Sequence, residues 1–383
     1  MKKVTAIIPT LLILSSLVAC QSSITNVECV NNGHYTEAQL KYLTSDKYDD
    51  TTPYNGNMSI SKPEPITISF KRVHYSKSNP VHLKLTPIVS DDWFVIPPTA
   101  TYSVIGQNEF KFYNPILNHN YVVTVNSSSG KKYEELTVEN KQTVPGPRNL
   151  YIEGVENARD IGGWGKMVNG EYKTYMKQCL LYRSGRFNED KAEEVKVTIT
   201  ETGMKEVLDH LRIRTEIDLR KTSTNEVGGL TNKSVLGELV RYVQLPMAYN
   251  GNNILTFKGK VSGDDYEYDN PKMIKQFFEI LANRDNYPIN YHCSIGKDRT
   301  GCLSYLIEGL MGFDQETMYR DYMFTNFADA GLCKLTDITD RYGKTLDEYE
   351  HGETLQEKVY NYLNEVIGVS KENLDNIIAI LKA

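Results

Sequence analysis

Residues 287–301, YPINYHCSIGKDRTG, carry the clearest structural pattern in the sequence. Residues 287–292 have the pattern of a short strand. Residues 300–311 have the pattern of a helix, because apolar residues recur there at helical spacing: Leu303, Leu306, Ile307 and Leu310. Cys293 therefore begins a tight loop between a strand and the N-terminus of a helix. This order predicts an α/β domain with a central sheet flanked by helices.

The loop that follows Cys293 has the chemistry of a phosphate-binding site. The first N–H groups of a helix lack internal partners, and the helix dipole places positive partial charge beside them. Arg299 can hold two phosphate oxygens with its planar guanidinium. The same field favours a thiolate at Cys293, which is a strong nucleophile toward phosphorus. We expect the phosphate to lie against Arg299 and the loop amides of Ser294, Ile295, Gly296 and Lys297.

The neighbours of Cys293 have roles that the sequence leaves open. Thr300 is placed to hydrogen-bond the sulfur when it leaves phosphorus. His292 is expected to orient the loop, or else it is a hydrogen-bonded core histidine. Lys297 either reaches a phosphate group, which favours multiply phosphorylated ligands such as inositol phosphates, or it is a solvated side chain. Cys293 itself has the alternative of a buried core thiol.

The motif His-Cys-x-x-Gly-Lys-Asp-Arg-Thr-Gly at residues 292–301 resembles the signature loop of cysteine-dependent phosphatases, in particular the bacterial tyrosine/serine phosphatases. Further blocks resemble that family in the same order along residues 150–383. They are residues 157–163, 182–185, 217–220 with Glu226, 319–322 and 368–381. The resemblance implies a phosphoric monoester hydrolase that forms a phosphocysteine intermediate and uses neither a metal nor another cofactor.

These blocks also have plainer interpretations. Arg159 and Asp160 would be an exposed charge pair before a glycine turn, which contributes little to stability. Residues 182–185 would be a strand end with ordinary turn residues. Asp218 ends a strand-like run, residues 214–219, and ligands gather at strand ends in α/β sheets. We therefore expect Asp218 near the site.

Cleavage of a phosphate ester needs a general acid, because protonating the leaving oxygen contributes on the order of 10²–10⁴ in rate. Asp298 lies inside the loop, whereas Asp218 comes from another strand end. The Lys-Asp-Arg loops of similar enzymes imply that Asp298 is the acid; its alternative role is that of a structural carboxylate. The predicted catalytic set is Cys293, Arg299, Asp298 and Thr300, with Asp218 as the other candidate acid.

The N-terminus predicts an extracytoplasmic location. Two lysines follow Met1, and residues 6–18 form an apolar run that is too short to span a membrane and has the shape of a secretory signal. The run ends in LVAC, residues 17–20, which resembles the bacterial lipoprotein box. Residues 1–20 would then be the signal, and lipidation of Cys20 would tether the protein to a membrane face. A cleaved signal with an incidental cysteine is the alternative.

Two segments separate this start from the catalytic part. Residues 21–60 are polar and lack periodicity, so we expect a flexible stalk with a short helix near residues 36–43. Residues 61–145 contain period-two runs between turn residues, which predicts an all-β sandwich. The runs are residues 66–70, 81–85, 110–112 and 121–125. Residues 117–125 resemble the tyrosine-corner strand of fibronectin type III-like domains, and residues 144–147 form the predicted linker.

The overall composition fits two or three domains in 383 residues. The net charge is −6, from 43 Lys and Arg against 49 Asp and Glu, and no basic stripe indicates nucleic-acid binding. Six cysteines show no metal-ligand spacing or disulfide framework. In an oxidising compartment Cys302 or Cys179 is a candidate to protect Cys293.

The sequence therefore predicts a membrane-anchored protein tyrosine/serine phosphatase that acts on phosphorylated proteins and also on phosphoinositides. One alternative is an inositol-phosphate or phytate phosphatase with the same loop. Another is a surface-binding lipoprotein with an inactive phosphatase-like domain. The intact Cys293, Asp298 and Arg299 argue against the inactive domain, because a binding protein has no need of all three.

Overall fold

The computed structural model describes residues 23–29, 32–54, 62–71, 80–89, 99–104, 108–189, 196–221, 233–249, 253–328 and 332–383. The predictions for the signal segment, Cys20 and Glu226 lie outside these residues. Within the described residues, no helix has the length and apolar character needed to cross a membrane.

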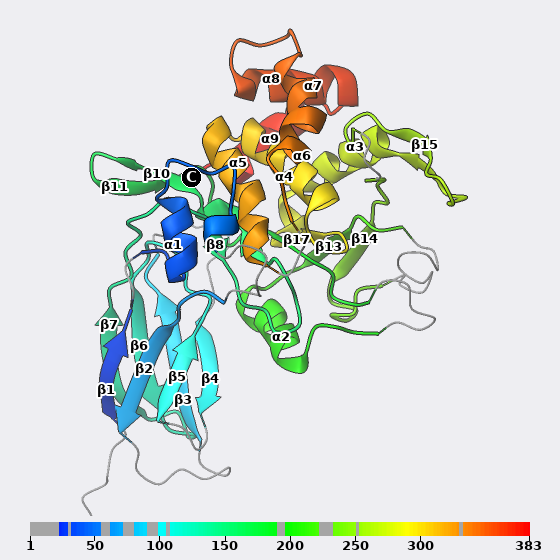
Figure 1. The fold of residues 1–383 in the computed structure, drawn as a ribbon. Helices are drawn as coiled ribbons and strands as arrows, with labels where there is room; N and C mark the ends of the chain where they lie inside the picture. Colours follow the sequence, from blue (N-terminus) through cyan, green and yellow to red (C-terminus); the bar gives the residue numbers. More distant parts are fainter. Residues whose placement is uncertain are drawn as a thin grey trace, which may run out of the picture.

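In the N-terminal part, the described residues form two antiparallel sheets that pack face to face (Figure 1). The first sheet has the order β1 (Ser23–Glu28), β2 (Ile66–Lys71) and β5 (Glu109–Phe112). The second has the order β4 (Ala100–Val104), β3 (Val81–Pro87), β6 (Tyr121–Asn126) and β7 (Lys132–Val138). The four predicted runs all lie in strands, and alternate apolar residues such as Leu83, Leu85, Val123 and Val125 are buried between the sheets.

Residues 21–60 are not a flexible stalk where the structure describes them. β1 pairs with β2, and α1 (Glu37–Leu43) begins at a capping box formed by Thr36 and Gln39. The ring of Tyr42 lies 5.5 Å from that of Phe327, and Tyr42 is fully buried. The short helix expected near residues 36–43 is confirmed as α1. The flexible stalk is wrong because α1 buries aromatic side chains against helices far away in the sequence, and polar composition carries no sign of that contact.

The C-terminal part is built on a mixed sheet. Among the described residues its order is β14 (Arg241–Gln244), β13 (Thr215–Asp218), β17 (Ile289–His292), β12 (Leu181–Ser184), β9 (Arg159–Asp160) and β8 (Arg148–Asn149). The first four strands are parallel to one another, and the last two pair antiparallel. Two hairpins project from this part: β10 (Gly165–Val168) with β11 (Glu171–Thr174), and β15 (Lys258–Lys260) with β16 (Glu267–Asp269).

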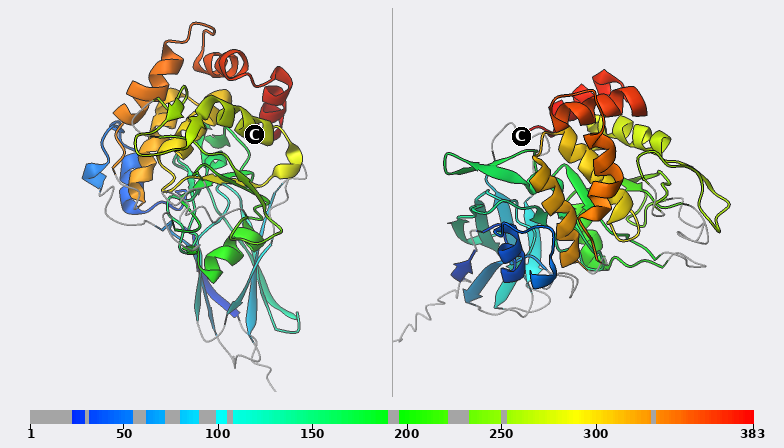
Figure 2. Two further views of the ribbon diagram at one scale, coloured as in Figure 1. Left: turned by 90° about the vertical axis from the view of Figure 1, so that its right-hand side faces the viewer. Right: turned by 45° about the horizontal axis from the view of Figure 1, so that its top comes forward.

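Helices cover this sheet, as the further views show (Figure 2). They are α2 (Glu201–Lys205), α3 (Asn270–Leu281), α4 (Asp298–Leu310), α5 (Gln315–Phe324), α6 (Thr336–Ile338), α7 (Lys344–Asp347), α8 (Leu355–Asn361) and α9 (Lys371–Leu381). α4 packs against α5 and α8, so it is buried on all sides. This central helix begins at the predicted loop.

The buried side chain of Arg148, in β8 of the C-terminal sheet, joins that sheet to the sandwich. Nη1 of Arg148 lies 3.1 Å from Oδ2 of Asp160, and both side chains are buried. The same guanidinium donates to the carbonyl oxygens of Asn114 and Pro115, which follow β5. The predicted linker is also packed, since the hydroxyl of Tyr35 donates to the carbonyl of Pro147. The two parts therefore meet through fixed polar contacts.

Candidate active site

The predicted loop lies between β17 and α4, at the edge where the parallel strands end (Figure 1). The sequence folds this way because a buried strand leads directly into a helix that carries its own N-terminal amides. The segments that follow the neighbouring strands are hydrogen-bonded to one another and to β17. The amide of Leu219 donates to the carbonyl of His292, and the amide of Met247 donates to the carbonyl of Leu219. This edge of an α/β sheet is where ligands bind.

Three consecutive carbonyl groups of the loop, residues 294–296, are held from outside it. The first accepts hydrogen bonds from the backbone amide and the guanidinium of Arg186. The second accepts from the side-chain amide of Asn157 at 3.1 Å. The third accepts from Asn157 at 3.0 Å and from Nη2 of Arg183 at 2.8 Å. Carbonyls drawn outward leave the loop amides to face the interior, which is the arrangement that binds an anion.

Gly296 is required by this geometry. Its φ of +69° lies in the left-handed region. A Cβ atom at this position would lie 2.5 Å from the carbonyl oxygen of Ser184. Both the backbone conformation and the space therefore exclude a side chain at this position.

The reactive side chains are buried around the loop. Cys293 is 2 % exposed, and Arg299 follows it in the first turn of α4. Nη1 of Arg299 donates to the carbonyl of Leu219 at 3.3 Å, which fixes its direction. The hydroxyl of Thr300 is buried and has no hydrogen-bond partner among the described atoms. A buried hydroxyl without a partner costs stability. We therefore expect the Thr300 hydroxyl to donate to the sulfur of Cys293.

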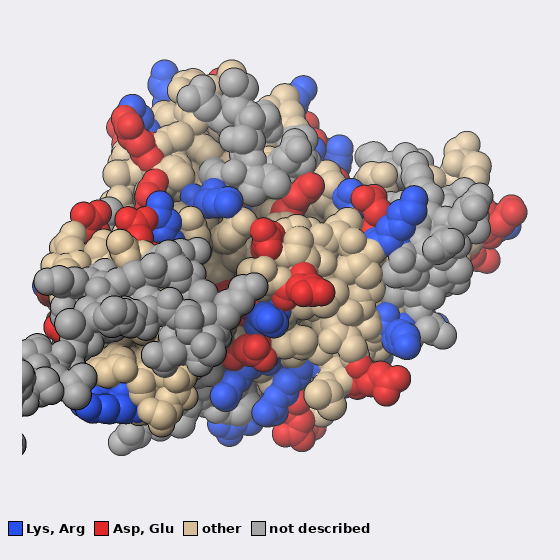
Figure 3. All heavy atoms as spheres, turned by 90° about the horizontal axis from the view of Figure 1, so that it is seen from below, with Lys and Arg blue, Asp and Glu red and all other residues tan. Residues whose placement is uncertain are grey.

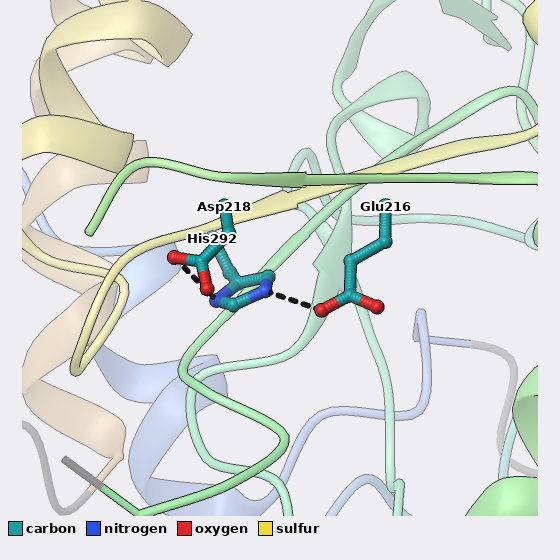
Figure 4. A group of neighbouring side chains, drawn as sticks. All are labelled: Glu216, Asp218 and His292. Carbon is teal, nitrogen blue, oxygen red and sulfur yellow. Dashed lines mark hydrogen bonds and ion pairs between the residues drawn. The ribbon is translucent and has the colours of Figure 1, made fainter. Parts of the chain in front are cut away.

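His292 stands between two carboxylates behind the loop (Figure 4). Its Nε2 lies 3.0 Å from Oε1 of Glu216, and its Nδ1 lies 3.1 Å from the carbonyl oxygen of Cys293. Burial alone would lower the pKa of His292, but Asp218 and Glu216 outweigh it and raise that pKa. Both ring nitrogens face acceptors, so the geometry fits an imidazolium that donates twice. A positive charge is thereby placed beside Cys293.

Glu216, Asp218 and His292 also have the composition of a metal site, with ligand atoms within 4.8 Å of one another. Their donor atoms are engaged elsewhere, however. Ser234 donates to Oε2 of Glu216, and the Arg220 guanidinium occupies the Asp218 carboxylate. These residues fit a charge-compensated support for the histidine better than a metal centre.

Asp218 has the properties of a structural carboxylate. The guanidinium of Arg220 folds back onto it at 2.8 Å, and the hydroxyl of Tyr242 donates to it at 3.0 Å. Burial raises the pKa of Asp218, but Arg220 and His292 outweigh burial and lower it to about 2. A carboxylate that stays ionised cannot supply a proton near neutral pH. Asp218 is therefore not suited to be the general acid.

Asp298 has the opposite properties. It is the first residue of α4, and its side chain keeps some exposure at the site. Burial raises its pKa above the ordinary value, although Lys297, Arg341 and Arg299 act in the other direction. Nη1 of Arg341, in the helical turn η6 (Thr339–Gly343), lies 3.7 Å from Oδ1 of Asp298. A partly exposed carboxyl group with a raised pKa suits a proton donor.

The side chain of Lys297 is directed away from a phosphate in the loop. Its Nζ donates to the carbonyl of Leu332 at 2.6 Å and lies 3.7 Å from Oδ2 of Asp337. Of the groups of Lys297, only the backbone amide can contribute to the phosphate-binding loop. The predicted role of this side chain as a phosphate ligand does not match this geometry.

The model of a protein family described as "Tyrosine phosphatase family" matches residues 150–383. The chain belongs to the tyrosine phosphatase family. Within this family match lie all the residues of the loop and the blocks that anchor it. The five described cysteines, Cys293 among them, are free thiols.

Individual relatives of this tyrosine phosphatase cover less of it. OCA1 of Scheffersomyces stipitis, which carries a tyrosine-protein phosphatase name, is 30% identical over 74 residues, or 19% of this chain and 32% of that protein. The chain thus spans about a third of that relative's length. The catalytic core of the PP-IP phosphatase SIW14 from S. cerevisiae, in complex with citrate, has a TM-score of 0.29 at 18% identity. The match covers 43% of this chain and 84% of the SIW14 chain. The crystal structure of P. aeruginosa TpbA has a TM-score of 0.27 at 15% identity, and the match covers 57% of this chain and 96% of TpbA.

Sequence reasoning missed several residues of this phosphatase site. The block at residues 157–163 was singled out without roles for its residues: Asn157 anchors the loop, and Arg159 and Asp160 are buried, so the alternative of an exposed pair is wrong. Glu216 carries a usable signal, because it lies two residues before Asp218 and so on the same face of a buried strand. Tyr249 carries none: its ring covers Arg299 at 4.7 Å, a contact made only by the folded chain.

Proposed function

We propose that this protein hydrolyses phosphoric monoesters through a phosphocysteine intermediate. The observation that carries the proposal is a loop whose carbonyls of residues 294–296 are all tied outward, with Cys293 at its start and Arg299 in the following turn. In the first step the thiolate of Cys293 forms a bond to phosphorus as the bond to the leaving oxygen breaks. Arg299 and the loop amides stabilise the equatorial oxygens, and Asp298 protonates the leaving oxygen.

The second step restores the enzyme. A water molecule forms the new oxygen–phosphorus bond while the sulfur–phosphorus bond breaks, and its proton passes to the Asp298 carboxylate. Phosphate and a thiolate result, and the Thr300 hydroxyl donates to the departing sulfur. The buried imidazolium of His292 stabilises that thiolate from behind the loop.

The substrates that we propose are phosphotyrosyl proteins. Tyr249 is 50 % exposed beside Arg299, so it offers a flat apolar wall to an aromatic leaving group. Basic and acidic side chains are interspersed on the face shown in Figure 3. The alternative, an inositol-phosphate substrate, is supported by Arg341, whose guanidinium stands 3.7 Å from Asp298. Membrane phosphoinositides would use the same cation.

Substrate class is tested with the native chain and Tyr249→Leu. We expect the native protein to release phosphate from p-nitrophenyl phosphate and a phosphotyrosyl peptide at rates unchanged by EDTA, and more slowly from inositol hexakisphosphate. Loss of the aromatic wall should lower kcat/KM for the aryl phosphates by roughly 3–10-fold and leave an alkyl phosphate unchanged. Leu239→Ala, at a 98 % exposed position, is the control. A preference for inositol hexakisphosphate would support the alternative, and no turnover of any substrate would exclude enzymatic function.

We also propose that the N-terminus anchors the protein through a lipid on Cys20, outside the cytoplasm, and that the sandwich is a fibronectin type III-like domain. The second proposal is supported by the strand orders of the two sheets and by Tyr121, whose hydroxyl accepts from the amide of Ile116 at 2.7 Å, as in a tyrosine corner. The lipid anchor is tested in bacterial cells. Cys20→Ser should shift the protein from the membrane fraction to the soluble fraction, whereas Cys29→Ser should not. Membrane association that survives Cys20→Ser would rule out the anchor.

A further inference from the structure

Three distant blocks of the sequence meet in a buried network beneath the phosphate loop. Its centre is the carboxylate of Asp321 on α5. Nε of Arg159 donates to Oδ1 of Asp321 at 2.9 Å, and Nη1 of Arg183 donates to Oδ2 at 2.7 Å. Nε1 of Trp164 donates to Oδ1 as well, at 2.9 Å. Each of these four side chains is almost completely buried.

A second carboxyl group lies beside the network. Glu308 on α4 is buried beside it, and burial together with Asp321 raises the pKa of Glu308 well above its ordinary value. The guanidinium groups of Arg159 and Arg183 lower the pKa of Asp321 despite its burial, so that group is an anion. Two guanidinium groups thus face one carboxylate.

Arg183 connects this network to the loop. One nitrogen of its guanidinium binds Asp321, and the other donates to the carbonyl of Gly296 at 2.8 Å. Arg159 acts in parallel, since its Nη1 donates to the side-chain oxygen of Asn157, whose amide holds the carbonyls of Ile295 and Gly296. A planar fork is needed to bind two acceptors in fixed directions, which an ammonium group does poorly.

We propose that Arg183 is a positioning residue for phosphate-ester hydrolysis: with Asn157 it holds the Gly296 carbonyl outward, so that the loop amides face the transition state. This inference rests on the proposed function. It assigns a role in catalysis to the blocks at residues 157–163, 182–185 and 319–322, which the chemical mechanism alone leaves unexplained. Arg183 acts through Gly296 and does not touch the substrate.

The test compares Arg183→Lys and Asn157→Gly with Trp164→Phe. All three lose a polar contact of the network, but only the first two lose a bond to the loop. Glycine suits the positive φ of 54° at Asn157. Well below the melting temperature of each variant, we expect Arg183→Lys and Asn157→Gly to lose about 10–100-fold in kcat/KM for p-nitrophenyl phosphate. Trp164→Phe should remain within about 3-fold of the native value, which the same principle predicts for an intact loop.

Orthovanadate separates positioning from general destabilisation, because it resembles the five-coordinate transition state. Its inhibition constant should rise in parallel with the loss of kcat/KM, whereas that of inorganic phosphate should change less. Native activity with unaltered vanadate inhibition in the two loop variants would overturn the inference and leave the proposed function intact. So would equal losses in Trp164→Phe, or failure of both loop variants to melt cooperatively. An inactive native protein would instead refute the proposed function.

Discussion

Cys293→Ser is expected to release no measurable phosphate from any ester and still to bind inorganic phosphate. A serine hydroxyl is a far weaker nucleophile than a thiolate, so attack on phosphorus is lost, and we expect kcat to fall by about 10⁴-fold or more. The loop amides and Arg299 are unchanged, so the anion site persists. Turnover of p-nitrophenyl phosphate and calorimetric titration with phosphate measure the two properties on the same protein.

Cys302→Ala is the matched control for that variant. Cys302 lies on α4 and is fully buried, and burial raises its pKa, so it is an inert thiol packed like a small apolar residue. We expect Cys302→Ala to keep most of the native activity. Substantial turnover by Cys293→Ser, or equal losses in both variants, would contradict a mechanism based on Cys293.

The local part of the site was predictable from sequence. The strand expected at residues 287–292 is β17, and the helix expected at residues 300–311 is α4, because a buried apolar pattern and a glycine-containing loop specify both. The start of α1 was also predictable, since Thr36 and Gln39 form a capping box. These features depend on neighbours within a few residues along the chain.

Features set by tertiary contacts were not predictable. Asp218 was a candidate acid because it lies at a strand end. Only the folded chain shows that the Arg220 guanidinium folds back and donates to its carboxylate, which keeps Asp218 ionised. The side chain of Lys297 looked like a phosphate ligand, and only the nearby Leu332 carbonyl and Asp337 show that it is directed elsewhere. Such contacts cannot be predicted from composition or periodicity, because they depend on how a side chain folds back or on a separate segment of the chain.

Asp298→Asn should slow substrates in proportion to how poorly their leaving groups depart. An alkyl phosphate needs a proton on its leaving oxygen, so its kcat should fall by roughly 10²–10⁴-fold. A nitrophenolate departs without a proton, so p-nitrophenyl phosphate should lose far less. Burial raises the pKa of Asp298, and activity with the alkyl ester should therefore persist to higher pH than an ordinary carboxyl allows, declining as pH rises through that pKa. This decline should be absent in Asp298→Asn.

Asp337→Asn separates the loss of a proton donor from a change in local charge. Nη2 of Arg341 lies 3.4 Å from Oδ1 of Asp337, so the variant removes one negative charge from the same cluster that contains Asp298. Because Asp298 keeps its carboxyl group, we expect the ratio of aryl to alkyl turnover to stay near the native value. Asp298→Asn should raise that ratio by the loss on the alkyl ester divided by the smaller loss on the aryl ester. Equal losses on both esters would instead make Asp298 a structural carboxylate of the loop and require another proton donor.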